Sequence, residues 1–326
     1  MKRLSIIVPI FNVEKYLLRC LDSLYLQDIP LNDYEVLVIN DGSTDTSLEL
    51  ARSYLSRFQN LKLFNQENIG VGSARNKGIR EANGKYLFFV DADDFIEPNC
   101  LKKLLECLES KKLDLLRFNY KSINSNGLNL EISKKSIKNT IHCVDVVDGN
   151  TFLTDYLGWI CYVWLFFYDT SFIKKNSIFF NETMYFEDID WMVRMLPMAK
   201  RVQSIDYQVY YYYRREGSIT KSLQLEKKNK IINDKLQNII TLKQLSKTTN
   251  KKEIILWYNG MISLIVMSIL AYAENEVPKR KKEIISFLYK NNYFPIKSFR
   301  FTFKQKVNVF LINLSPRLYC LLKYKK

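Results

Sequence analysis

Three carboxylates follow directly on a short apolar run. Asp91, Asp93 and Asp94 come after Tyr86–Val90, whose five apolar residues predict a strand buried on both faces. Carboxylates this close repel one another and raise one another's pKa, and a bound cation relieves the repulsion. Carboxylate oxygens suit Mg²⁺ or Mn²⁺, and Mg²⁺ in particular adds phosphate oxygens and water to its shell. The cluster therefore predicts a metal-bound phosphate ligand; the alternative is a solvated acidic turn that caps the next helix.

Strands and helices alternate along the first hundred residues, joined by short loops, which is typical of a parallel α/β sheet. In such sheets ligands bind outside the carboxyl ends of the strands. Asp41, just after the second strand, is therefore expected near the acid cluster, although a helix cap is the alternative role. The expected strands are Leu4–Pro9, Tyr34–Ile39, Leu61–Phe64 and Tyr86–Val90. A first helix is expected after its N-cap Asn12, and a second after Ser43 or Asp45 as N-cap. A third is expected to begin at Val71 and to have Gly84 as its C-cap.

Other nucleotide-binding sites of this fold class lack their fingerprints here. No GxGxxG follows the first strand, and Gly70-Val71-Gly72 continues to Arg75 instead of a third glycine. The sequence also has no GxxxxGK[ST] loop. These observations argue against hydride transfer and against P-loop hydrolysis.

Composition indicates two modules with different surroundings. The 326 residues suffice for a large domain and a smaller one, and the net charge is +15. Residues 1–215 hold 27 basic and 27 acidic side chains, whereas residues 216–326 hold 22 and 7. One histidine, His142, and six cysteines without metal spacing predict neither a zinc site nor a histidine triad. The first apolar run is too short for a signal sequence and no spanning helix is expected, so a cytoplasmic protein with free thiols is predicted.

Four blocks of sequence, in their order and spacing, resemble the inverting family 2 glycosyltransferases: IIVPIFNVEKYL, VINDGSTDTS, NIGVGSARNKGI and GKYLFFVDADDF. The resemblance is dense over residues 4–100 and thinner to about 220. It implies a GT-A nucleotide-diphospho-sugar transferase fold over 1–220, an α/β fold with a Rossmann-like, mostly parallel sheet. Its nucleotide-sugar half is expected at 1–100 and its acceptor half at 101–220, followed by a helical, basic region at 221–326.

The resemblance also implies a donor site. Pro9 and Asp41 would line the nucleotide-base pocket, and the Asp41 carboxylate would accept the N3 hydrogen of uracil, which favours a UDP- or dTDP-sugar. Arg75 would lie near the nucleotide and its phosphates. Asp91-Ala92-Asp93 would be the DxD motif that contacts ribose and the diphosphate-bound metal. The expected ligands of this Mn²⁺ or Mg²⁺ are Asp93, Asp91 and Asp94.

A second acidic group begins at Glu187 and matches the family's ED signature at the head of a helix that ends just before Pro197. The resemblance makes Asp188 the general base for the acceptor hydroxyl, with Glu187 positioning it or binding the acceptor, and Asp190 as the rival base. The hypothesis requires Asp188 to face the same cavity as the DxD motif and Asp41. The alternative is a helix N-terminus whose acids favour its dipole.

A late strand is expected at Gln208–Tyr213. It leads into a segment similar to the family's region that closes over the diphosphate, where Arg214, Arg215 and Ser218 are candidate contacts. The QxxRW signature of processive synthases is missing, so one sugar per acceptor is expected. Residues 120–150 are expected to form a hairpin or mobile loop, and most aromatic residues of Phe152–Tyr168 are expected in the core.

The last third is expected to be helical, over Lys227–Leu245 and Glu253–Ala273. Residues 296–326 mix aromatic, aliphatic and basic side chains, which is typical of an element attracted to anionic lipid; a solvated basic face is the alternative. No nucleic-acid partner is expected, because no recognised module accompanies the charge. The hypothesis is a glycosyltransferase, peripheral on the inner face of the cell membrane, that adds a sugar to a lipid-linked glycan in capsule, exopolysaccharide or LPS-type synthesis. The alternative is a non-catalytic protein that binds nucleotide-sugar or membrane.

Overall fold

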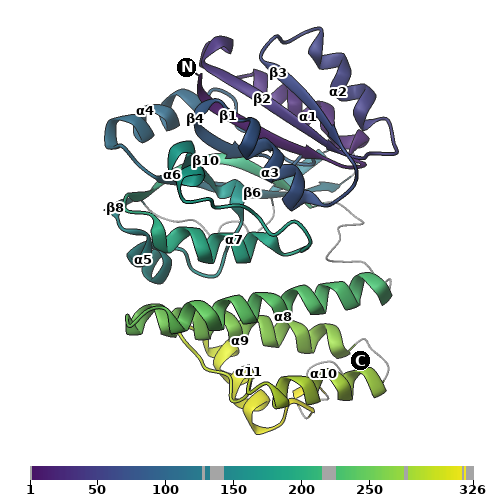
Figure 1. The fold of residues 1–326 in the computed structure, drawn as a ribbon, viewed down its shortest axis with the longest axis vertical. Helices are drawn as coiled ribbons and strands as arrows, with labels where there is room; N and C mark the ends of the chain where they lie inside the picture. Colours follow the sequence, from purple (N-terminus) through teal and green to yellow (C-terminus); the bar gives the residue numbers. More distant parts are fainter. Residues whose placement is uncertain are drawn as a thin grey trace. The chain divides into compact units, whose positions relative to one another are not determined.

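The computed structural model describes residues 2–126, 129–132, 143–214, 225–274, 278–317 and 319–320. The chain divides into two compact units, Met1–Ser218 and Ile219–Lys326. The first unit has one sheet with helices packed against it, and the second is helical (Figure 1).

The first unit contains these elements. The strands are β1 (Lys2–Ile10), β2 (Tyr34–Asp41), β3 (Leu61–Gln66), β4 (Gly84–Phe89), β5 (Phe95–Ile96), β6 (Leu115–Asn126), β7 (Asn129–Ile132), β8 (Val144–Val147), β9 (Phe166–Asp169) and β10 (Val202–Tyr213). The helices are α1 (Glu14–Tyr25), α2 (Ser47–Leu55), α3 (Val71–Glu81), α4 (Leu101–Lys111), α5 (Gly149–Thr151), α6 (Thr170–Lys175) and α7 (Glu187–Met195). Shorter helical turns lie at Leu31–Asp33, Phe152–Tyr156, Val163–Leu165 and Leu196–Met198.

The four strands predicted for the first hundred residues are confirmed, and they are parallel. β1 lies between β2 and β4, and β3 borders β2. β2 is buried along its whole length, which explains why its sequence is a continuous apolar run and not an alternating one. Because the strands are parallel, the segments that follow β1, β2 and β4 emerge at one edge of the sheet.

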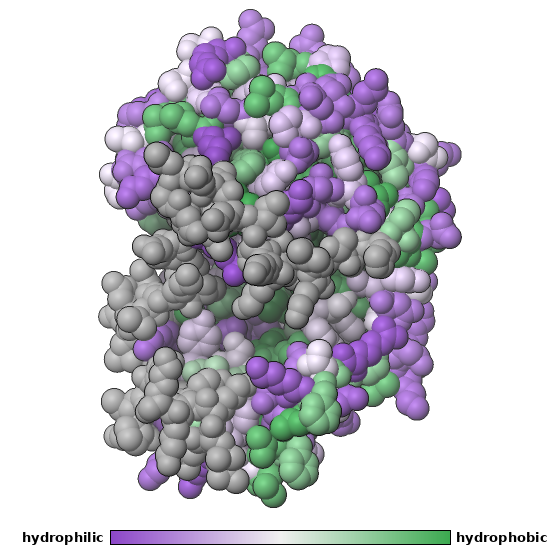
Figure 2. Space-filling view, turned by 180° about the vertical axis from the view of Figure 1, so that it is seen from behind, coloured by the Kyte–Doolittle hydropathy of each residue, from purple (hydrophilic) through white to green (hydrophobic). Residues whose placement is uncertain are grey.

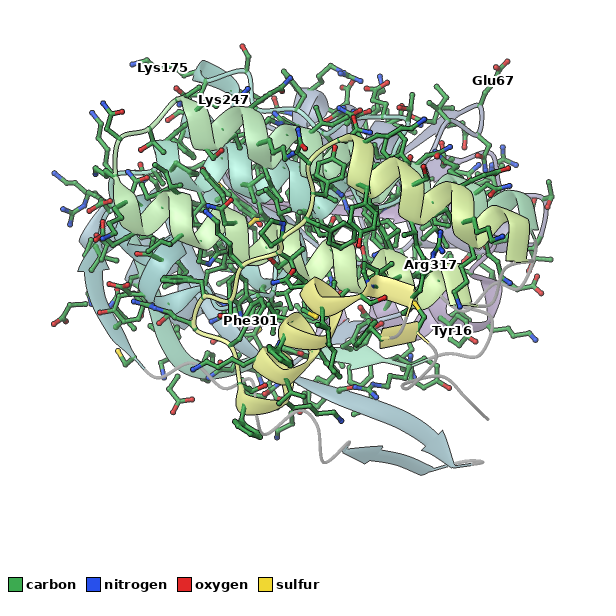
Figure 3. All side chains as sticks on the ribbon, turned by 90° about the horizontal axis from the view of Figure 1, so that it is seen from below. Tyr16, Glu67, Lys175, Lys247, Phe301 and Arg317 are labelled. Carbon is green, nitrogen blue, oxygen red and sulfur yellow. The ribbon has the colours of Figure 1, made fainter. Side chains whose placement is uncertain are left out.

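The other half of the sheet is mixed. The full order is β3-β2-β1-β4-β9-β6-β10-β5, with β7 on β6 and β8 on β10. β9 is antiparallel to both neighbours, β4 and β6, whereas β10 is parallel to β6. The hairpin expected within 120–150 is formed by β6 and β7 and extends away from the rest of the ribbon (Figure 3). Residues 133–142 of that stretch lie outside the described residues.

Two expected caps are wrong. Asn12 does not cap α1: it has a φ of +51°, and its side-chain oxygen accepts hydrogen bonds from the N–H groups of Thr44 and Asp45 at 2.8 and 3.3 Å. α1 is capped from that neighbouring loop instead, since Asp45 Oδ2 accepts from the Glu14 N–H at 3.1 Å. Gly84 is the first residue of β4, where a Cβ would lie 2.4 Å from the backbone of β1. The loops after β1 and β2 are therefore tied to each other.

Helix α3 packs very closely on β1. A Cβ at Gly78 would lie 2.3 Å from Ile7 Cγ2, so only glycine allows this approach. Arg75 lies one turn earlier in the helix. The close packing therefore fixes Arg75 relative to the sheet.

The second unit consists of α8 (Leu225–Lys247), α9 (Lys252–Glu274), α10 (Pro278–Lys290) and α11 (Phe303–Leu314), which confirms the expected helices at its start. α8 and α9 pack side by side (Figure 1). No spanning helix was expected, and the described residues contain one, Lys252–Tyr272, that is long and apolar enough for a span by length and composition. Of its most apolar window, 67% is buried inside the protein, and buried core helices have the same character.

Candidate active site

Arg75 is the centre of an ion-pair network. It lies in α3 and is only 3% exposed. Its Nη2 donates to Asp91 Oδ1 at 2.8 Å. Its Nη1 donates to Glu187 Oε1 at 2.5 Å and to Asp188 Oδ1 at 2.9 Å. One guanidinium therefore joins the end of β4 to the first turn of α7.

The network brings the two predicted acidic groups together. The hypothesis requires Asp188 and the DxD motif to share a cavity, and Asp188 and Asp91 bind the same guanidinium. Arg75 was expected beside the nucleotide phosphates, yet both of its terminal nitrogens hold carboxylates. Arg75 therefore sets the distance between the donor side and the base side of the site.

Glu187 and Asp188 are neighbours with different access to solvent. Their side chains are 5% and 22% exposed. Burial raises the pKa of Glu187 well above its ordinary value, and the Asp188 charge adds to that shift. Burial also raises the pKa of Asp188, against the opposing charge of Arg75. The Glu187 Oε2 atom is buried and has no hydrogen-bond partner, so it is the part of this carboxyl that is least compatible with a negative charge.

Asp188 is the more accessible of the two acids. Burial raises its pKa above the usual range for aspartate, which is the direction that favours proton transfer near neutral pH. The nearby backbone of Val163 lowers the pKa of Asp188, whereas Arg75 Nη1 donates to its Oδ1 at 2.9 Å. The rival Asp190 belongs to a separate pair, since Nε and Nη2 of Arg194 donate to its Oδ2 at 2.9 and 2.7 Å.

The loop after β4 is held from inside by Tyr210 of β10. The Asp91 N–H donates to the Tyr210 hydroxyl at 3.0 Å, and that hydroxyl donates to Asp94 Oδ2 at 2.8 Å. The Tyr213 N–H donates to Asp94 Oδ1 at 2.7 Å. Asp94 is fully buried, and burial raises its pKa well above the ordinary value. Asp94 was expected among the metal ligands, but its position shows that it braces the loop.

The residues that stay accessible fit a metal that arrives with a diphosphate. Asp91 and Asp93 are partly exposed. Within the described ranges, no three His, Cys, Asp or Glu side chains are grouped to hold a metal ion. Mg²⁺ commonly takes only one or two protein carboxylates and fills its shell with phosphate oxygens and water. Two carboxylates at this edge are therefore a sufficient donor set.

Asp41 and Pro9 lie at the same edge. Asp41 is 4% exposed and accepts three hydrogen bonds, from Gln66 Nε2 at 2.8 Å and from the N–H groups of Ile69 and Gly70 at 3.1 and 2.9 Å. A carboxylate has about four lone-pair positions, so one is left for a nucleotide base. Pro9 pairs with Ile39 inside the sheet and is half-buried. Asp41 thus holds the loop before α3, a role that the sequence did not indicate.

Of the three expected closing residues, the structure describes Arg214 alone. Its Nε donates to Ser122 Oγ at 2.7 Å, and its backbone N–H donates to the Ile123 carbonyl. The side chain is exposed at the end of β10. Arg215 and Ser218 lie outside the described residues.

The sequence interpretation missed an aromatic stack beside the acids. The Trp164 ring lies 4.3 Å from Tyr210 and 5.6 Å from Tyr212, nearly parallel to both. Tyr162 stacks on Trp164 at 4.9 Å. Trp164 is buried, as expected for this stretch, but Tyr162 is 39% exposed. The signal in the sequence was the spacing of Tyr210 and Tyr212, since alternate residues of a strand share a face.

Comparison with known proteins gives a consistent result. Residues 5–163 match the family model of glycosyl transferase family 2. The chain is 30% identical to the uncharacterized glycosyltransferase EpsJ of Bacillus subtilis over 66% of this chain and 62% of that protein. It is 31% identical to the uncharacterized glycosyltransferase YibD of Escherichia coli over 70% and 66%, and 32% identical to a poly(ribitol-phosphate) beta-glucosyltransferase of Bacillus spizizenii over 66% and 33%. The chain therefore spans about two thirds or less of these relatives' own lengths.

Solved structures show the same architecture. Residues 1–349 of Staphylococcus aureus TarS, in complex with UDP-GlcNAc, match with a TM-score of 0.62 at 22% identity, over 96% of this chain and 81% of that one. The fold is therefore the GT-A fold, with helices after the unit that contains the sheet. Within this class, residues 5–163 belong to glycosyl transferase family 2, which confirms the family resemblance.

Proposed function

We propose that this protein is an inverting glycosyltransferase that moves one sugar from a UDP-sugar to a hydroxyl of a glycan acceptor. The observation that carries the proposal is the Arg75 guanidinium, which holds the DxD residue Asp91 and the candidate base Asp188 at neighbouring nitrogens. Donor and acceptor groups must meet within such a distance for direct transfer. TarS binds UDP-GlcNAc and UDP in its solved structures, which supports a UDP-sugar as donor.

The proposed reaction is a single displacement. Asp188 accepts the proton of the acceptor hydroxyl as the hydroxyl oxygen attacks C1 of the donor sugar. The bond from C1 to the diphosphate oxygen breaks on the opposite face, and UDP leaves with the electron pair. Asp91 and Asp93 would hold a Mn²⁺ or Mg²⁺ ion, which when bound stabilises the charge on the leaving diphosphate. Glu187 would stay neutral, since burial raises its pKa well above the ordinary value, and would leave the negative charge to Asp188.

We expect purified protein to release UDP from at least one member of a panel of UDP-sugars in the presence of Mn²⁺. EDTA should lower the rate by at least about a hundredfold, because the diphosphate then leaves without a Lewis acid, and added Mn²⁺ should restore it. The measurement is a coupled UDP-release assay with anomeric analysis of the product by NMR.

Asp93→Asn should mimic metal removal and resist rescue by Mn²⁺. Glu97→Gln, a matched acid-to-amide change four residues further on, should keep the wild-type rate, because Glu97 bonds to Tyr211 outside the network. Binding of UDP without turnover of any donor would contradict the proposed function. Retention of the donor's anomeric configuration would contradict single displacement.

We also propose a cytoplasmic enzyme that attaches peripherally to the inner face of the cell membrane through its second unit, where a lipid-linked acceptor would lie. Helix α11 supports this proposal. Phe303, Val307, Phe310 and Leu314 recur every three or four residues, so they share one face, and they are 84%, 40%, 67% and 65% exposed. Figure 2 shows hydrophobic surface at the lower end of the helical unit. An exposed apolar stripe on a basic helical unit suits an anionic lipid surface.

We expect the full chain to float with phosphatidylglycerol vesicles and to float less with phosphatidylcholine vesicles. Phe303→Glu combined with Phe310→Glu should lower the bound fraction at least fivefold. The two glutamates replace apolar rings with charges that do not enter the apolar part of the interface and that anionic lipid repels. The control is Ile240→Glu, a change at a 38% exposed position of α8. Equal flotation of the double variant and the wild type would contradict this role of α11.

A further inference from the structure

Two aromatic side chains are exposed in the described part of the first unit, Phe11 at 45% and Tyr162 at 39%. Phe11 follows β1 on the donor side of the site. Tyr162 immediately precedes the helical turn Val163–Leu165. An exposed aromatic ring next to an active site is a candidate contact surface, since a large flat ring adds binding area at little entropic cost.

Tyr162 is held rigidly by its neighbours. It stacks on Trp164 at 4.9 Å with an angle of 16° between the rings, and lies 6.3 Å from Tyr212 at 22°. Trp164 is 3% exposed and stacks in turn on Tyr210, whose hydroxyl bonds the DxD loop. The exposed ring is thus the outermost member of a stack anchored in the donor site.

Tyr162 is also tied to the base side of the site. The backbone of the next residue, Val163, is close enough to the Asp188 carboxyl to lower its pKa. Burial raises the pKa of Tyr162 to about 12, with smaller contributions from the neighbouring tyrosines and the charge of Asp188. The phenol therefore stays neutral at physiological pH and can donate a hydrogen bond at the rim of the site.

We infer that Tyr162, supported by Trp164, forms the acceptor subsite and that its occupant is a saccharide ring. The flat phenol ring would take the apolar C–H face of the sugar, which leaves a hydroxyl on the ring edge to reach Asp188. The acceptor would bind between Tyr162 and Asp188, because the diphosphate of the donor would occupy the position beside Asp91 and Asp93. This inference rests on the proposed function.

A ring fits the platform better than an open-chain polyol phosphate does. A saccharide ring is rigid and presents several C–H groups in one plane, whereas an open-chain polyol loses torsional freedom when it is pressed flat. The electron-rich face of the phenol also attracts the positively polarised C–H groups of a sugar. The inference therefore gives this chain a different kind of acceptor from that of the relative named for poly(ribitol phosphate).

The test uses UDP release by the full chain with the donor identified in the panel above. The acceptor probes are the methyl β-glycosides of glucose, galactose and N-acetylglucosamine, with poly(ribitol phosphate) as the open-chain comparator. We expect at least one methyl glycoside to raise UDP release above the rate with water alone. Tyr162→Ala should raise the KM for that glycoside about tenfold, with a smaller change in kcat. Tyr162→Phe should stay within about twofold of the wild type, because it keeps the ring face.

Met198→Ala is the matched control, since Met198 is 45% exposed in the same half of the unit. It should leave all kinetic constants unchanged. Acceleration by poly(ribitol phosphate) and by none of the glycosides would overturn the inference, as would an unchanged glycoside KM in Tyr162→Ala or no acceleration by any probe. Absence of UDP release from every donor would instead contradict the proposed function itself.

Discussion

Asp188→Asn should lower kcat about a thousandfold, because a positioned general base contributes roughly 10²–10⁴ to the rate of such a step. Asparagine keeps the size of the side chain, and its amide oxygen can still accept from Arg75 Nη1, so the site should keep its shape. The amide cannot take the proton of the acceptor hydroxyl. Affinity for UDP, measured by calorimetry, should change by less than about threefold, since the base lies on the acceptor side.

The pH profile provides a second measurement of the same residue. The base must be ionised to act, so kcat/KM should fall as the pH drops through its pKa. Because burial raises the pKa of Asp188, this acid limb should lie above the ordinary range for aspartate, and the residual activity of Asp188→Asn should lack it.

The matched control is Asp190→Asn, two residues further along α7. Asp190 pairs with Arg194 and takes no part in the Arg75 network, so the variant should keep kcat within about threefold. A small loss of stability is the expected effect of breaking this pair. If Asp188→Asn turned over at the wild-type rate, the assignment of the base would be wrong.

Arg75→Met should lower the free energy of unfolding of the first unit by about 3–5 kcal/mol, because it leaves buried carboxylates without their cation. Arg75 is 3% exposed and pairs with Asp91, Glu187 and Asp188. Turnover should also be lost, since the Arg75 guanidinium pairs with Asp91 on one side of the site and with Asp188 on the other. The measurement is urea unfolding followed by tryptophan fluorescence. Three of the four tryptophans lie in the first unit, so the signal mainly reports the unfolding of that unit.

The loss should depend on pH in a defined direction. Without Arg75 the pKa values of Glu187 and Asp188 rise further above those of the unfolded chain, because burial then acts without an opposing charge. A carboxyl with a raised native pKa binds more protons folded than unfolded, so its contribution to stability falls as the pH rises through that interval. The difference between Arg75→Met and the wild type should therefore be larger at pH 8 than at pH 5.5.

Two further variants test whether the lost stability comes from the Arg75 ion pairs or from the loss of side-chain packing alone. Adding Glu187→Gln to Arg75→Met removes one of the unpaired acids and should recover part of the stability. Arg194→Met breaks a pair whose arginine is 34% exposed and affects one buried aspartate instead of three acids, so it should cost less than Arg75→Met. Equal losses in Arg75→Met and Arg194→Met, without any pH dependence, would contradict a central role for Arg75.

Much of the first hundred residues was predictable because the signals there are local. A strand buried between parallel neighbours reads as a continuous apolar run, and this feature identified β1, β2 and β4. The head of α7 was recognisable from its acids and its apolar period. The caps at Asn12 and Gly84 were wrong because their partners come from other loops and strands.

The mixed half of the sheet was harder to predict. The sequence gives no sign that β9 inserts antiparallel between β4 and β6, since that position depends on pairing between segments far apart in the chain. The same insertion brings Trp164 over Tyr210. The aromatic composition of Phe152–Tyr168 predicted core side chains, and it gave no indication that Tyr162 would be exposed while Trp164 is buried.

The sequence by itself determined the chemistry available to this protein: carboxylates at the ends of parallel strands, an acidic helix head, and a basic helical region. These follow from residue type and short-range period, which are properties of a single segment. Only the tertiary structure decided which of these acids pair with Arg75 and which one is buried to hold the loop after β4. Arg75 selects Asp91, Glu187 and Asp188, while Tyr210 and Tyr213 turn Asp94 inward. The physical reason is that burial and pairing set the charge of a carboxyl, and both depend on neighbours more than a hundred residues away.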